Sequence, residues 1–154
     1  TMMEPEVKVT VLALDLEGTL ISNAVSQIAR PGLFEFLEDC RKLFPRIVIF
    51  TSVNEERFRT IANLLTTEGY APNWFADIEY ITWCGETKNL IFVDGASPEE
   101  ILLVDDYEKY VHPGQERQWI KAPYFDYPYS DDDQGLREVS QLLRARASSV
   151  KSLL

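Results

Sequence analysis

Short apolar runs rich in β-branched residues recur along the chain, a pattern typical of strands that are buried on both faces of a sheet. Each of the stronger runs stops abruptly at polar or charged residues. The pattern predicts strands at residues 7–16, 46–51, 78–83, 101–104 and 119–122, with a further short extended segment at 90–93.

Three amphipathic patterns between and after these runs predict helices. Apolar residues recur at spacings of three and four from Pro31, which suits a first helical turn, to Pro45, which ends the helix. Asn54 is a suitable N-cap for a second helix, and Gly69 closes it. The third pattern begins at Gly135 and places four apolar residues on one face: Leu136, Val139, Leu142 and Leu143.

Alternation of strands and helices predicts an α/β fold with a central parallel sheet flanked by helices. The 154 residues contain no internal repeat and no low-complexity linker, so we expect one domain over residues 1–154 with a core at about 7–145. Ligands of such sheets bind at the carboxyl ends of the strands.

Composition narrows the classes of function. The formal net charge of -10 disfavours a nucleic-acid partner, because such a surface repels a phosphate backbone. No apolar run approaches the roughly 20 residues that span a bilayer, and because the first apolar run is short and follows Glu4 and Glu6, we do not expect a signal peptide. Neither of the two cysteines, Cys40 and Cys84, has the partners of a zinc site, so we expect both to pack in the core of a cytoplasmic protein.

Polar residues with related chemistry follow four of the predicted strands and turns. Carboxylates that meet at one sheet edge repel one another unless a cation lies among them, and oxygen ligands suit Mg²⁺. A hydroxyl can donate to a phosphoryl oxygen, and a lysine can neutralise its charge. These residues, in chain order, are Asp15 with Glu17, Thr51 with Ser52, Lys88, and Asp105 with Asp106. Together they are typical of a phosphoryl-transfer site with a carboxylate nucleophile.

The segment Asp15-Leu16-Glu17-Gly18-Thr19 resembles the first motif, D-x-D-x-T, of the haloacid dehalogenase superfamily. The resemblance is strongest to the NLI-interacting-factor-like branch, that of the small phosphatases acting on the carboxy-terminal domain of RNA polymerase II. It spans roughly residues 9–145, and its further motifs stand in order: RPGLFEFL at 30–37, FTS at 50–52, Lys88 before an apolar segment, and VDD at 104–106.

The resemblance implies a Rossmann-like phosphatase domain and a role for each matching residue. Asp15 is then the nucleophile that becomes an aspartyl phosphate, and Glu17 protonates the leaving group and activates the hydrolytic water. Thr51 binds the transferring phosphoryl group, and Lys88 balances the charge between Asp15 and the phosphate.

The same resemblance implies Mg²⁺ as the cofactor. Asp106 is then the acidic ligand of the last motif, and Asp105 orients either a metal-bound water or Lys88. The implied metal site comprises Asp15, the backbone carbonyl of Glu17, Asp105 and Asp106.

Glu17 stands where most phosphatases of the superfamily have Asp. Glu is a competent acid with a similar pKa, and the enolase-phosphatases, which this stretch also resembles, have Glu at the same place. The alternative is a phosphatase fold with weak or no catalysis that serves as a binding module. A response-regulator receiver is disfavoured by motif order, because its Lys comes last, whereas Lys88 precedes Asp105.

Few residues separate the motifs, so a cap domain is not expected. Thr19 and Arg30 are close in sequence, and between Ser52 and Lys88 there is room for a small β insertion at most. An open site favours a phosphorylated protein as substrate, with a small phosphomonoester as the other possibility. His112 suits a loop role, and the run at 131–133, three Asp residues, suits a solvated loop and helix start.

Overall fold

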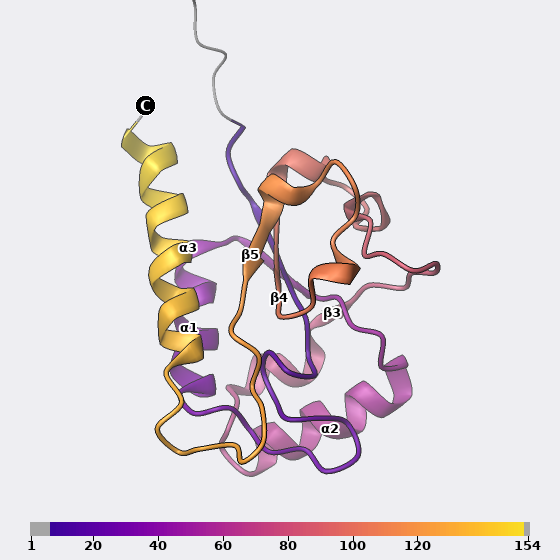
Figure 1. The fold of residues 1–154 in the computed structure, drawn as a ribbon, viewed down its shortest axis with the longest axis vertical. Helices are drawn as coiled ribbons and strands as arrows, with labels where there is room; N and C mark the ends of the chain where they lie inside the picture. Colours follow the sequence, from indigo (N-terminus) through magenta and orange to yellow (C-terminus); the bar gives the residue numbers. More distant parts are fainter. Residues whose placement is uncertain (1–6, 153–154) are drawn as a thin grey trace, which may run out of the picture.

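The computed structural model describes residues 7–152, with side chains described for residues 7–147. Its centre is a five-stranded sheet in the order β3-β2-β1-β4-β5, in which every neighbouring pair is parallel (Figure 1). The strands are β1 (Val11–Leu14), β2 (Arg46–Ile49), β3 (Glu79–Tyr80), β4 (Ile101–Asp105) and β5 (Trp119–Lys121). The α/β fold predicted from the sequence is confirmed.

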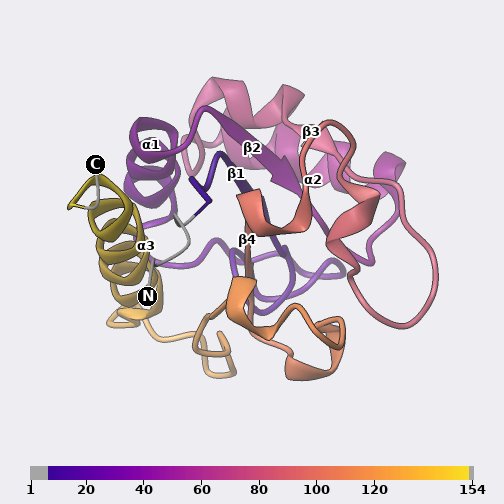
Figure 2. The ribbon, with the colours of Figure 1, turned by 90° about the horizontal axis from the view of Figure 1, so that it is seen from above.

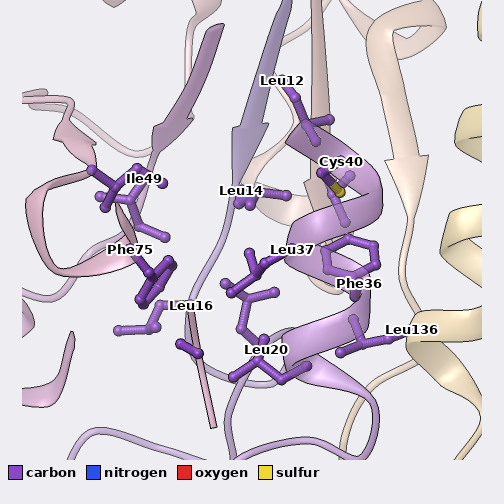
Figure 3. Close-up of a cluster of buried hydrophobic side chains, with 14 of the residues drawn as sticks. Leu12, Leu14, Leu16, Leu20, Phe36, Leu37, Cys40, Ile49, Phe75 and Leu136 are labelled. Atoms are coloured by element: carbon purple, nitrogen blue, oxygen red, sulfur yellow. The ribbon is translucent and has the colours of Figure 1, made fainter. Parts of the chain in front are cut away.

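Three helices cover one face of the sheet: α1 (Leu33–Leu43), α2 (Glu55–Thr67) and α3 (Gly135–Ser152). Successive side chains of a strand point to opposite faces, so Leu12 and Leu14 of β1 pack toward the helices. Figure 3 shows both of them directed at the apolar side of α1, where Phe36 and Leu37 lie. This packing produces one continuous hydrophobic core between the sheet and the helix layer.

Within residues 7–152, the opposite face is covered without an α-helix. Leu90 and Val93 pack there against Val11 and Ala13 of β1. Figure 2 shows α1 and α3 on one side of the strands and the segment that follows β3 on the other. The prediction of an extended segment at 90–93 is wrong, because Leu90–Phe92 forms a 3-10 turn. Its apolar residues are needed to cover the sheet, and a turn presents them as well as a strand does.

Most of the predicted helix boundaries are confirmed. Asn54 caps α2 by accepting a hydrogen bond from the backbone N–H of Arg57, and Gly69 follows that helix with φ of 80°. Helix α1 begins two residues later than predicted, because Gly32 is its N-cap in the left-handed region and Pro31 lies outside.

Three further expectations differ from the structure. Strand β3 has only two residues where the sequence predicts a strand at 78–83. Leu142 is 48% exposed rather than packed in the core, whereas Leu136, Val139 and Leu143 are buried as expected. Cys40 is buried as expected, but Cys84 lies exposed in the turn after β3.

The order of the strands fixes where a site can form. From β1 the chain builds outward through β2 and β3, and it then crosses to β4 on the other side of β1. The carboxyl ends of β1 and β4 therefore lie side by side at the point where the order reverses, which is the usual ligand position in such sheets. Between Ser52 and Lys88 the chain forms α2, a 3-10 turn and β3, with no inserted β unit. Within the described part of the chain, no helix is long and apolar enough to cross a membrane.

Candidate functional site

Lys88 is the centre of a buried ionic cluster at the carboxyl ends of β1 and β4. Its side chain is 0% exposed, and its Nζ donates to Asp15 Oδ1 at 2.8 Å and to Asp105 Oδ2 at 2.6 Å. Asp15 follows β1 directly, and Asp105 is the last residue of β4. The backbone N–H of Lys88 donates to the carbonyl of Tyr110 at 2.7 Å, which fixes where the lysine enters the site.

Asp106 completes the cluster from the next position of the chain. The hydroxyl oxygen of Thr19 lies 2.8 Å from Asp15 Oδ2 and 2.9 Å from Asp106 Oδ1, so it bridges the two carboxyl groups. One oxygen from each of Asp15, Asp105 and Asp106 lies within 4.8 Å of the others. The structure thus brings together four of the residues that the sequence analysis singled out: Asp15, Lys88, Asp105 and Asp106.

The electrostatics of the cluster follow from burial and from the excess of carboxylates over lysine. Burial raises the pKa of Asp105 to about 7, and the charge of Asp15 adds to the rise. Burial, followed by the hydrogen bond and charge of Asp15, raises the pKa of Asp106 to about 7. Burial lowers the pKa of the Lys88 ammonium, but Asp15 and Asp105 outweigh it and hold that pKa above its usual value.

This donor set fits a hard divalent cation. Mg²⁺ prefers carboxylate oxygens, and a cation among Asp15, Asp105 and Asp106 would offset the repulsion between these carboxylates. Asp105 has both oxygens engaged, since Oδ2 accepts from Lys88 and Oδ1 accepts from the backbone N–H of Tyr107 at 3.0 Å. Asp15 is engaged in the same way, at Oδ1 by Lys88 and at Oδ2 by Thr19. Asp106 is only partly buried, whereas the Asp105 side chain is 0% exposed, so Asp106 is better placed than Asp105 to hold the ion.

Thr51 and Glu17 lie around the cluster with other contacts. Thr51 is buried just beyond β2, and its hydroxyl accepts from the backbone N–H of Val53 at 3.2 Å, which leaves its own hydrogen for another acceptor. Glu17 Oε2 accepts from the backbone N–H of Ala24 at 2.7 Å, so its carboxylate is directed at the loop after the first motif.

Several residues that lie next to the cluster were not predicted as site residues from the sequence. The ring of Tyr110 lies 4.5 Å from Lys88 Nζ, and a Cβ on Gly18 would lie 2.9 Å from the ring of Tyr124. Thr19 belongs to the first motif, and its fixed place there was a signal of its importance. The tyrosines gave no such signal, because exposed aromatic residues are common on protein surfaces.

His112, for which a loop role was predicted, contacts the residue that precedes Lys88. Its Nδ1 is 2.7 Å from the hydroxyl of Thr87, the residue before Lys88. This contact ties the loop at 112 to the segment that supplies the lysine.

The family model of the NLI interacting factor-like phosphatases matches residues 10–153, which is nearly the whole chain. The chain belongs to this family. The match confirms the resemblance carried by the four motifs, and with it the branch of the haloacid dehalogenase superfamily to which they point. No curated protein matches the chain in sequence.

Two solved structures share the fold of this chain. One is a variant of the fission yeast RNA polymerase II CTD phosphatase Fcp1 bound to beryllium fluoride, with a TM-score of 0.60 and 14% identity. The match covers 94% of this chain and 51% of Fcp1. A second structure, of Fcp1 as an essential RNA polymerase II CTD phosphatase, gives a TM-score of 0.59 and 14% identity over 93% of this chain and 51% of that one. The chain therefore spans about half the length of these relatives, and at this identity the likeness is one of fold.

Proposed function

We propose that this chain is a Mg²⁺-dependent phosphomonoester hydrolase that works through an aspartyl phosphate on Asp15. The observation that carries the proposal is the position of Lys88, which is buried between Asp15 and Asp105 with Asp106 beside them. Membership of a phosphatase family supports the same reaction class. A buried lysine among three carboxylates has a clear use in a site that must hold a phosphate dianion next to a carboxylate nucleophile.

The reaction proceeds in two displacements at phosphorus. A carboxylate oxygen of Asp15 bonds to phosphorus while the bond to the leaving oxygen breaks, and Glu17 gives that oxygen a proton. A water then bonds to phosphorus and loses a proton to Glu17, and the bond between phosphorus and Asp15 breaks. Inorganic phosphate leaves, and both side chains return to their first states.

The other residues bind and orient the phosphate. Thr51 donates its hydroxyl hydrogen to a phosphoryl oxygen, and Lys88 keeps Asp15 and the phosphate from repelling each other. The residues that would hold Mg²⁺ are Asp15, Asp106 and the carbonyl of Glu17, and Asp105 would orient either a metal-bound water or Lys88. When bound, Mg²⁺ supplies positive charge that stabilises the transferring phosphoryl group.

A binding module without catalysis is the competing function, and Glu17 is its only support. The hydrogen bond from the backbone N–H of Ala24 holds the Glu17 carboxylate in a defined position at the loop after the first motif. A pure scaffold has no need of three neighbouring carboxylates, of which burial and the proximity of Asp15 raise the pKa of Asp105 and Asp106. These observations favour the enzyme.

For the substrate we propose a phosphorylated segment of a protein, with a small phosphomonoester as the alternative. The described residues, 7–152, form no cap over the site, and Thr51, Trp83 and Gly85 are among the residues that line a groove of about 380 Å³. Such a groove has room for residues that flank a phosphorylated residue. The expectation of a cytoplasmic setting without nucleic-acid or membrane partners rests on composition and stays a prediction.

Hydrolysis of an aryl phosphate at neutral pH tests the proposal. We expect turnover with Mg²⁺, none with excess chelator, and background rates for Asp15→Asn with circular dichroism unchanged. Asp77→Asn is the matched control, because Asp77 is exposed and remote from the cluster. Turnover of Asp15→Asn at the wild-type rate would rule out Asp15 as the nucleophile, and Mg²⁺ binding without any turnover would favour the binding module.

A further inference from the structure

Arg30 is among the most deeply buried side chains of the protein, and it has two polar partners. It is 1% exposed, and its Nε and Nη2 donate to Asp133 Oδ2 and Oδ1 at 2.7 and 3.3 Å. Its Nη1 donates to the backbone carbonyl of Thr19 at 3.1 Å. The planar guanidinium thus uses one edge for a bidentate ion pair and another donor for the backbone of the first motif.

The residue that Arg30 holds is the one that bridges the carboxylates. The hydroxyl of Thr19 contacts both Asp15 and Asp106, which come from β1 and from the end of β4. A shift of the Thr19 backbone would therefore change the spacing of the nucleophile and the acidic residue opposite it. Arg30 is 15 residues beyond Asp15 and contacts neither carboxylate directly.

Surrounding groups leave the guanidinium little freedom. Its carbon lies 5.2 Å from the centre of the Phe125 ring, and the backbone N–H of Phe125 donates to the carbonyl of Gly18 at 2.9 Å. A Cβ on Gly135 would lie only 1.9 Å from Arg30 Nη2, so the first residue of α3 must be glycine for the arginine to fit.

Asp133 differs from the two aspartates that precede it. It accepts from Arg30 and also from the backbone N–H of Gly135 at 3.1 Å, whereas Asp131 and Asp132 are exposed. The run was expected to be a solvated loop and helix start, and Asp133 does stand at the start of α3, but it is ion-paired and only 21% exposed. The start of α3 is thereby fastened to the first motif through one ion pair.

We propose that Arg30 and Asp133 are positioning residues of the active site, which hold the Thr19 backbone so that its hydroxyl keeps Asp15 and Asp106 at catalytic spacing. The inference rests on the proposed function. Buried ion pairs contribute little net stability because both charges must leave water, so this pair is better explained by the geometry that it fixes. Groups one step removed from a metal site typically change its affinity or activity by about 10–100-fold when they are lost.

Three variants test the inference. Asp133→Asn removes the charge that orients Arg30. Arg30→Lys keeps a positive charge but cannot make the bidentate contact with Asp133. Gly135→Ala keeps both charges and displaces the guanidinium, at a helical position where Ala is otherwise favourable. The matched control is Asp132→Asn, the same substitution on the exposed neighbour.

We expect each of the three variants to lower kcat by about 10–100-fold with KM within about twofold of wild type, and to weaken Mn²⁺ binding measured by calorimetry. Asp132→Asn should match wild type in all three quantities. All measurements are made well below the midpoint of thermal unfolding of each variant, so that loss of folded protein does not contribute.

A merely structural pair would lower the unfolding midpoint and leave kcat and Mn²⁺ affinity of the folded protein unchanged. That result in Asp133→Asn and Gly135→Ala would overturn the inference, even if Arg30→Lys failed to fold. An inactive wild type would count against the proposed function, and the Mn²⁺ affinities would then still decide whether the pair positions the carboxylates.

Discussion

At the scale of single residues, the cluster holds carboxyl groups that are costly to ionise together. The pKa of Asp106 is raised from 3.8 to about 7, first by burial and then by Asp15, so the metal-free folded state keeps a proton that the unfolded chain loses near pH 4. The stability contributed by this group is fully present below about pH 4 and is lost as the pH rises through about 7.

Asp106→Asn should therefore flatten the pH dependence of stability. In excess chelator, we expect wild type to lose more unfolding free energy than the variant between about pH 5 and about pH 8, by on the order of 1 kcal/mol. Urea denaturation at the two pH values measures the difference. Mg²⁺ at the higher pH should stabilise wild type more than the variant, because it binds the folded state through Asp106. Equal slopes for both proteins would contradict the account.

Residues of this site differ in how far the sequence could predict them. Asp15, Asp105 and Asp106 stand directly at strand ends, so strand prediction alone brings them to one edge. Arg30 and Asp133 are separated by 103 positions, and an arginine beside a proline and a run of aspartates both look like surface features. Only the packed tertiary structure pairs them.

At the scale of elements, the turn after β1 must pass very close to the end of β4. Gly18 has φ of 76°, and a Cβ there would lie 2.7 Å from Asp106 Oδ2. Gly69, at the end of α2, has φ of 80° but no atom within 4 Å of such a Cβ. The two glycines therefore share a backbone conformation and differ in their surroundings.

Gly18→Ala and Gly69→Ala separate these two effects. We expect Gly69→Ala to lose about 1–2 kcal/mol of unfolding free energy from backbone strain and to keep its activity. Gly18→Ala should lose at least as much stability, and its kcat should fall by about 100-fold because Asp106 must move. Urea denaturation and phosphatase assays on both variants measure this. Full activity of Gly18→Ala would show that the close approach is not needed for catalysis.

The predicted elements were correct where the hydrophobic periodicity and the capping residues indicated the same boundaries. Helix α2 has its N-cap at Asn54 and its closing glycine at Gly69, as predicted. The prediction of an extended segment at 90–93 was wrong because apolar residues indicate burial and not backbone conformation. The Asn89 side chain accepts a hydrogen bond from the backbone N–H of Ile91, and a 3-10 turn begins there instead. Strand β3 is short because pairing with β2 ends after two residues, although Ile81 stays buried.

At the scale of the whole molecule, one sheet and one layer of helices present an acidic site at an uncapped edge. The reversal of strand order between β1 and β4 explains why Asp15 and Asp106, which lie far apart in the sequence, meet at one edge of the sheet. The central claim is that Asp15 carries the phosphoryl group during turnover.

Mass spectrometry of acid-quenched protein tests that claim directly. In Glu17→Gln, an aryl phosphate with its good leaving group should still phosphorylate the protein, while hydrolysis slows because the base is gone. We predict a mass increase of one phosphoryl group in the presence of Mg²⁺, located on the peptide that contains Asp15 and absent from the double variant with Asp15→Asn. Release of the aryl product without that adduct, or an adduct on another residue, would contradict the account.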